Sequence, residues 1–108
     1  MLNWPKKRNW GWYATLMRTP WFCVKLLRFK PGGELSLQRH KHRTEIWWFI
    51  KGWGVREPQT FEWCAFPFQI WKIKPNTWHT FMAFSGEPVY ALELQYGKKV
   101  TEDDIERK

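Results

Sequence analysis

Residues 31–52 constrain the fold of this chain more than any other segment. Residues 31–33, Pro-Gly-Gly, are typical of a turn, because glycine tolerates positive φ and proline presets one turn position. Residues 35–42 alternate between polar and apolar side chains, which predicts a β-strand with a side-chain period of two. After a bend, residues 45–50 predict a second strand that ends at a glycine.

One face of the first predicted strand carries side chains that bind metals. Gln38, His40 and His42 alternate onto that face, and the carboxylate of Glu45 follows the bend. Imidazole nitrogen, amide oxygen and carboxylate oxygen suit a borderline or hard divalent ion such as Zn, Mn, Fe, Co or Ni. His79 lies far downstream, and a turn followed by a strand would return it to this group. The pattern therefore predicts one divalent metal ion.

Short apolar segments separated by turn signals fill the rest of the chain. Further strands are predicted at residues 10–16, 21–29, 52–56, 60–66, 69–74, 77–84 and 89–96. Regular short strands, without a helix-period segment of useful length, predict an all-β sandwich or barrel. Residues 1–9 are predicted to be a loosely held basic arm. Residues 98–108 are predicted to be a polar tail in which residues 101–104 cap one helical turn.

Length and charge narrow the possible functions. A chain of 108 residues predicts a single domain, residues 1–108. Its 18 basic and 10 acidic residues give a net charge of +8, which favours an anionic small-molecule substrate. Nucleic acid is not favoured, because the positive charges are spread along the chain without an oligonucleotide-binding motif.

Two further features bear on the cellular compartment of the protein. No run of apolar residues is long enough for a membrane span, and the basic N-terminus is not followed by the apolar core of a signal peptide. Cys23 and Cys64 form no Cys-x-x-Cys motif, so they are expected to be reduced thiols in a cytoplasm.

The second predicted strand is apolar on both faces. Trp47 and Phe49 share one face, while Ile46, Trp48 and Ile50 lie on the other. Both faces are therefore expected to be covered, one by the barrel interior and the other by a second sheet or subunit. We predict a homodimer, since twofold pairing is the commonest way to cover such a face.

The spacing in residues 32–52 resembles the first motif of the cupin family. That motif is Gly, five residues, His-x-His, three or four residues, Glu, six residues and Gly. Here Gln38 stands in place of the first histidine, followed by His40 and Glu45 at the family spacing. A shifted register would pair His40 with His42, but it leaves only two residues before Glu45, so the first register is favoured.

The remaining segments extend this resemblance over nearly the whole chain. Residues 74–79, Lys-Pro-Asn-Thr-Trp-His, are similar to the second cupin motif, with Asn76 replacing a glycine, which is tolerable because asparagine visits the left-handed region. Residues 10–13, 31–47, 77–79 and 102–105 resemble the mannose-6-phosphate isomerase type II cupin domain. In bacteria that domain is often fused behind a mannose-1-phosphate guanylyltransferase. The resemblance implies an all-β, jelly-roll-like cupin double-stranded β-barrel.

The resemblance also implies an activity, the interconversion of mannose 6-phosphate and fructose 6-phosphate. The implied metal ligands are Gln38, His40, Glu45 and His79. Either the metal set holds an ion that stabilises a developing enediolate, or these residues are hydrogen-bonded polar groups in a barrel without a metal.

Five further residues are candidates for catalysis and substrate binding. His42 or Glu93 would move the proton between neighbouring carbons. Arg43 is the first choice for the substrate phosphate, because its guanidinium can bind it with two parallel hydrogen bonds, and Lys25 is the second. A sugar could stack on Trp47, although core packing is its more ordinary role.

Two other functions suit the same sequence. One is a non-catalytic cupin that binds a carbohydrate or nucleotide. The other is a metal-dependent oxygenase, because two histidines and one carboxylate also suit non-haem iron. The ten tryptophans could fill the barrel and leave no room for a sugar phosphate.

Overall fold

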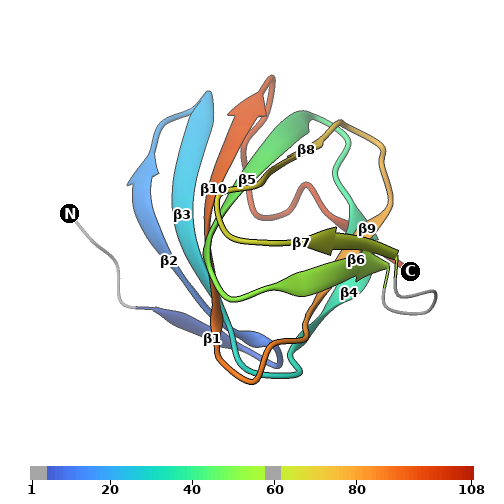
Figure 1. Ribbon diagram of the computed structural model, residues 1–108. Helices are drawn as coiled ribbons and strands as arrows, with labels where there is room; N and C mark the ends of the chain where they lie inside the picture. The colour runs from blue at the N-terminus through green and yellow to red at the C-terminus, as the bar shows by residue number, and fades with distance from the viewer. Residues whose placement is uncertain (1–4, 58–61) are drawn as a thin grey trace.

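The computed structural model describes residues 5–57 and 62–108, and these residues form an all-β fold (Figure 1). One sheet has six strands: β1 (Lys6–Arg8), β2 (Gly11–Arg18), β3 (Phe22–Phe29), β10 (Val89–Gly97), β5 (Arg43–Lys51) and β8 (Ile70–Ile73), in that spatial order. The other has five: β11 (Glu106–Arg107), β4 (Glu34–Arg39), β9 (His79–Ala83), β6 (Gly54–Glu57) and β7 (Glu62–Ala65). The prediction of an all-β barrel is confirmed.

The two sheets curve around a common interior, as Figure 1 shows. Neighbouring strands pair antiparallel within each sheet, and non-consecutive strands such as β3, β10 and β5 lie side by side. In β3 and β10 buried residues alternate with half-buried ones, as expected for strands with one face inside. None of the described residues forms a helix that could cross a membrane.

An aromatic cluster fills one part of the interior. Phe29, Phe49 and Phe81 are fully buried, and the ring of Phe81 lies 4.9 Å from Phe29 and 5.3 Å from Phe49. Trp47 is 2% exposed and its ring lies 6.0 Å from that of Phe81. Trp10 stacks on Phe29 at 4.5 Å and closes this end of the cluster. Another part of the interior holds buried polar and charged side chains, and the candidate site lies among them.

The first strand of the central segment differs from its prediction. It ends at Arg39 instead of His42, and its pairing with β9 shifts register between Leu35 and Gln38. Such an irregularity changes which side chains share a face, so Leu35 and Gln38 both lie buried although they are three residues apart. His42, predicted to share the face of Gln38, lies beyond the strand and is exposed.

Near both ends of the chain, described residues form strands that were not predicted. Residues 6–8 form β1 and pair with β2, so the prediction of a loose basic arm is wrong for these residues. The tail makes no helical turn: residues 102–103 form a turn, and β11 pairs with β4. The beginning of the strand predicted at residues 60–66 falls outside the described ranges.

Candidate metal centre

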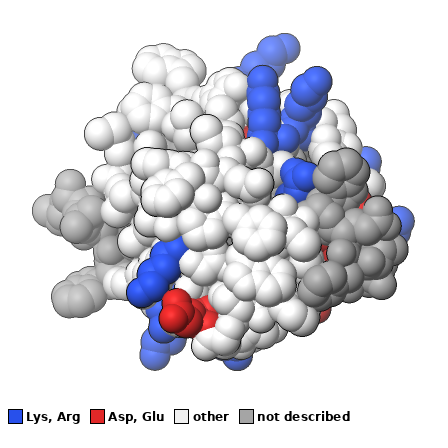
Figure 2. All heavy atoms as spheres, viewed as in Figure 1, with Lys and Arg blue, Asp and Glu red and all other residues white. Residues whose placement is uncertain are grey.

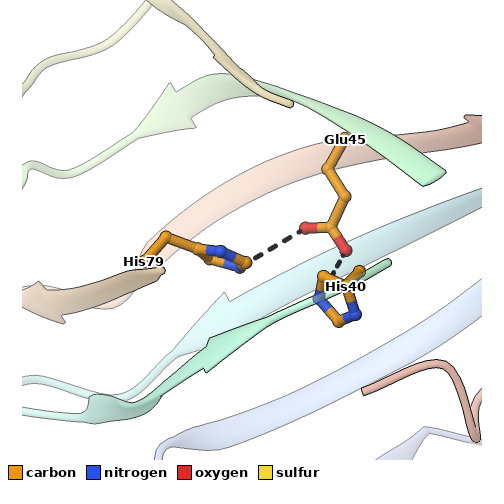
Figure 3. A group of neighbouring side chains, drawn as sticks. All are labelled: His40, Glu45 and His79. Carbon is orange, nitrogen blue, oxygen red and sulfur yellow. Dashed lines mark ion pairs between the residues drawn. The ribbon is translucent and has the colours of Figure 1, made fainter. Parts of the chain in front are cut away.

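Three side chains from three different segments meet in the barrel interior. Glu45 lies on β5, His79 begins β9, and His40 follows directly after β4. All three are buried, with exposed fractions of 5% or less. Their potential ligand atoms all lie within 4.8 Å of one another, and Figure 3 shows both imidazoles directed at the carboxylate.

The carboxylate of Glu45 is shared between the two histidines. Nε2 of His40 lies 2.9 Å from Oε2, and Nε2 of His79 lies 3.8 Å from Oε1. Oε1 also accepts a hydrogen bond of 3.1 Å from the Trp47 indole. The carboxylate is therefore oriented by an interior aromatic side chain and faces both imidazoles.

Each imidazole is bound through Nδ1 to a backbone carbonyl and faces Glu45 with Nε2. Nδ1 of His40 lies 2.6 Å from the Asp104 carbonyl oxygen, and Nδ1 of His79 lies 3.0 Å from that of Thr77. A carbonyl oxygen can only accept, so in each ring Nδ1 donates and a neutral ring presents an unprotonated Nε2. Burial lowers the pKa of His79 below 6.5, which keeps that ring neutral at neutral pH.

A divalent cation fits this donor set. Nε2 of His79 is buried and has no hydrogen-bond partner among the described residues. Two imidazole lone pairs directed at a carboxylate repel one another unless positive charge lies near them. Histidines that donate Nδ1–H to a carbonyl and offer Nε2 to an ion are the usual arrangement in protein metal sites.

Gln38 lies beside this group. It pairs with His79 across β4 and β9, is 6% exposed, and donates its Nε2 to the Ser36 carbonyl oxygen at 3.3 Å. Its Oε1 is therefore the atom that Gln38 can offer to a metal. A role for Gln38 as a fourth ligand remains a prediction.

Arg43 lines the cavity, and its guanidinium is bound to Glu45. Its Nε and Nη2 donate to Oε2 of Glu45 at 3.0 and 2.8 Å, and its Nη1 donates to the Thr101 carbonyl oxygen at 2.9 Å. Nη2 also lies 3.3 Å from Nε2 of His40. Burial alone would raise the pKa of Glu45, but the contact with His40, a hydrogen bond from Glu93 and the charge of Arg43 hold it well below 4.5.

Glu93 is a second buried carboxyl group beside Glu45, and its pKa is shifted in the opposite direction. It lies on β10 opposite Lys25 on β3 and Trp47 on β5. Burial, together with the charge of Glu45 and a hydrogen bond to it, raises the pKa of Glu93 well above 4.5. Oε1 of Glu93 accepts a 3.1 Å hydrogen bond from Gln95. The pKa values of the two carboxyl groups in the site are thus shifted in opposite directions.

We expect Glu93→Gln to flatten the pH dependence of stability. Because the folded-state pKa of Glu93 is raised, its contribution is complete below the unfolded-chain pKa near 4.5 and is lost as pH rises through the folded value. The variant should therefore match the wild type near pH 4 and lose less free energy of unfolding than the wild type between pH 5 and 8. Urea titrations of the metal-free proteins across this range measure the difference, and parallel curves would contradict it.

Lys25 and Trp47 lie at the site, whereas His42 does not. The Lys25 ammonium is buried over the Tyr13 ring at 4.4 Å and forms a 2.6 Å ion pair with Glu102. Trp47 is a core residue that holds Glu45, so little of its ring is open to a sugar. His42 is exposed and does not line this cavity, so its role as a proton shuttle stays a prediction.

The site opens into a cavity of about 1120 Å³. This exceeds the roughly 300–1,000 Å³ that is common for small-molecule sites, so the tryptophans do not fill the barrel. Its wall includes Gln38, His40, Glu45, His79, Glu93 and Gln95, and the basic side chains Arg8, Lys25, Arg43, Arg56 and Arg107. The wall also includes the acidic side chains Glu34, Glu57 and Glu102, so the size of the cavity, and not an excess of basic side chains, suits a sugar phosphate.

Sequence analysis missed the contribution of the tail. Thr101 and Asp104 offer carbonyl oxygens to Arg43 and His40, and Glu102 pairs with Lys25. The one available signal was three acidic residues in close succession near the end of a basic chain. Nothing in their spacing indicated that they would return to the metal motif.

The fold and the buried His-Glu-His group define the class: this is a cupin, a double-stranded β-helix protein. Solved structures with the same fold include an uncharacterised conserved protein with a double-stranded β-helix domain from Klebsiella pneumoniae, with a TM-score of 0.75, 18% identity, and coverage of 87% of this chain and 80% of that one. Oxalate decarboxylase from Bacillus subtilis has a TM-score of 0.78 at 15% identity, over 95% of this chain and 29% of that one.

Within that class, the chain belongs to the mannose-6-phosphate isomerase C-terminal family, whose model matches residues 4–108. Its relatives include a mannose-1-phosphate guanylyltransferase of Klebsiella pneumoniae and the alginate biosynthesis protein AlgA of Pseudomonas aeruginosa. Each is 33% identical over 100 residues, which cover 93% of this chain and 21% of the relative. The chain thus spans about a fifth of the length of these curated relatives.

Proposed function

We propose that this chain is a metal-dependent sugar-phosphate isomerase that interconverts mannose 6-phosphate and fructose 6-phosphate. The observation that carries the proposal is the buried group of His40, Glu45 and His79, whose two Nε2 atoms face one carboxylate at the wall of a large cavity. The family to which the chain belongs supports the choice of substrate.

The ligands and the acid–base group have separate roles. His40, Glu45 and His79, with Gln38 as a further donor, would hold a divalent ion that acts as a Lewis acid on substrate oxygens. Glu93 transfers the proton. Its raised pKa makes it a proton donor at neutral pH and a strong acceptor once ionised, so one carboxyl group can serve both halves of a transfer between adjacent carbons. The Gln95 amide holds Glu93 in place.

The basic side chains of the cavity wall would bind the phosphate. Arg43 and Lys25 are the proposed donors, and each would exchange part of its contact with Glu45 or Glu102 for phosphate oxygens. Lysine and arginine outnumber acidic side chains on the face seen in Figure 2, and the net charge of +8 favours the approach of an anion.

The direct test is turnover of mannose 6-phosphate in D₂O, followed by NMR. After loading with Zn, Mn, Fe, Co or Ni, we expect fructose 6-phosphate to form and deuterium to appear at the carbon that exchanges its proton. Glu93→Gln should abolish both signals while leaving the metal content unchanged. Failure of every metal-loaded preparation to convert or exchange the substrate would contradict the proposal.

One observation favours a second function, a metal-free binding module for a carbohydrate or nucleotide. The guanidinium of Arg43 already supplies a positive charge at Oε2 of Glu45, where an ion would also bind. In that case the wild type would bind no divalent metal but would still bind a sugar phosphate. Metal analysis alongside calorimetric titration with mannose 6-phosphate separates the two functions.

The proposal includes a homodimer formed through the outer face of the six-stranded sheet. Trp48 and Ile70 pair across β5 and β8 on that face and are 43% and 68% exposed. We expect a dimer by light scattering at micromolar concentration, and a monomer for Trp48→Glu, because a buried unpaired charge opposes association. Trp21→Glu, at an exposed residue outside this strand pair, should remain dimeric. A monomeric wild type would refute the dimer.

A cytoplasmic location goes with this proposal. Cys23 and Cys64 are both free, which suits a reducing compartment.

A further inference from the structure

Residues 98–107, here called the carboxy-terminal clasp, pass beside the metal centre and contact side chains of three different segments. Within the clasp, the Thr101 carbonyl accepts from Arg43, Glu102 pairs with Lys25, and Asp104 contacts His40. The clasp then continues as β11, which pairs with β4. It therefore connects residues that the two sheets supply separately.

Asp104 makes two kinds of contact at once. Its backbone carbonyl lies 2.6 Å from Nδ1 of His40. Its carboxylate oxygens accept from the backbone N–H groups of Lys41 at 3.0 Å and His42 at 2.9 Å. Asp104 is 7% exposed, so these contacts are shielded from water.

The segment that Asp104 holds has no strand partner of its own. Residues 40–42 lie between the end of β4 and the beginning of β5, and the backbone N–H groups of Lys41 and His42 both bond to Asp104. Backbone N–H groups that are withdrawn from water need an acceptor, and for these two partly buried groups the carboxylate takes the place of a neighbouring strand. The same residue then fixes the imidazole that this segment carries.

We propose that Asp104 is a positioning residue of the metal centre, which holds His40 in the tautomer and orientation that direct Nε2 toward Glu45. It acts through His40 and the bend that follows, and it does not contact the ion or the substrate. The part of the proposal that concerns metal affinity rests on the proposed function. The part that concerns the imidazole does not, because the His40 ring can be observed without a metal.

The chain offers a matched control on the same clasp. Glu106 accepts two hydrogen bonds from Arg39, at 2.9 and 3.1 Å, and contacts neither His40 nor residues 41–42. Glu106→Gln therefore weakens the attachment of the clasp while leaving the proposed positioning contacts intact. A merely structural role for the clasp predicts similar effects from the changes at positions 104 and 106.

The experiment compares the wild type with Asp104→Ala, Asp104→Asn and Glu106→Gln. Long-range ¹H–¹⁵N NMR of the metal-free proteins reports which imidazole nitrogen of His40 carries the proton. Titration with Co²⁺, followed by its visible absorption, reports affinity and ligand geometry. We expect a proton on Nδ1 of His40 in the wild type and Glu106→Gln. Asp104→Ala keeps the backbone carbonyl but loses the carboxylate that holds Lys41 and His42, so His40 should shift from that carbonyl and show a mixture of tautomers.

Co²⁺ affinity should fall about 10–100-fold in Asp104→Ala, the range usual for residues that orient a metal ligand. Asp104→Asn keeps one amide oxygen as acceptor, so its Co²⁺ affinity should lie between those of the wild type and Asp104→Ala. This variant also tests the proposal if Asp104→Ala does not fold. The proposal is overturned if the variants at position 104 match Glu106→Gln in both measurements. If the wild type binds no Co²⁺ but the His40 tautomer still changes, the positioning role holds and the metal-dependent function fails.

Discussion

Replacement of Glu45 by alanine is expected to lower the free energy of unfolding by about 3–5 kcal/mol, the usual cost of removing one member of a buried ion pair. Glu45 is 1% exposed and accepts two hydrogen bonds from the 5% exposed Arg43. Without the carboxylate, the Arg43 charge stays buried without its main counter-charge. The Trp47 indole also loses its acceptor.

Urea unfolding of the metal-free proteins measures this cost without a contribution from metal binding. Glu106→Ala provides the comparison, because it removes the carboxylate from a half-exposed pair with Arg39, and exposed pairs are worth about 0–1 kcal/mol. If Glu45→Ala costs no more than Glu106→Ala, the buried network around Glu45 does not hold the interior together as described.

Phe81→Ala is the second change with a large expected effect, again about 3–5 kcal/mol, because it opens a cavity in the core. Phe81 is fully buried and its ring contacts those of Phe29, Phe49 and Trp47. It lies two residues after His79 on β9, so the loss of packing should also loosen a metal ligand. Metal affinity is therefore expected to fall together with stability.

Thermal and urea unfolding of Phe81→Ala and Phe81→Leu test this expectation. The leucine variant keeps more of the volume and should cost less. Met17→Ala, at a side chain that is 55% exposed, should change the free energy of unfolding by less than about 0.5 kcal/mol. A Phe81→Ala variant as stable as Met17→Ala would show that the aromatic cluster is not the core of this barrel.

Much of the fold could be predicted from the sequence because most of its strands carry a local signal, which is alternation of side chains between turn residues. Alternation and turn residues predicted most strands to within a few positions, and residues 45–50 fall within β5. His40, Glu45 and His79 could be predicted as a group because a strand, a bend and a returning strand are enough to bring them together. The structure does place these three side chains together.

The positions that could not be predicted depend on partners far away in the sequence. The register shift that brings Leu35 and Gln38 to the same interior arises in the pairing of β4 with β9, and the period of two in β4 alone does not reveal it. His42 was predicted to share the face of Gln38, but β4 ends at Arg39 and His42 lies beyond it. The link from Asp104 to His40 spans 64 residues, and no local pattern encodes it.

The central claim is that His40, Glu45 and His79 hold a divalent metal ion. The most direct test is the metal content of the protein by mass spectrometry, after equilibration with Zn²⁺ and removal of free metal, for the wild type, His79→Ala and His42→Ala. We predict about one equivalent per chain in the wild type and in His42→Ala, and none in His79→Ala. No metal in the wild type, or equal metal in all three proteins, would contradict the account.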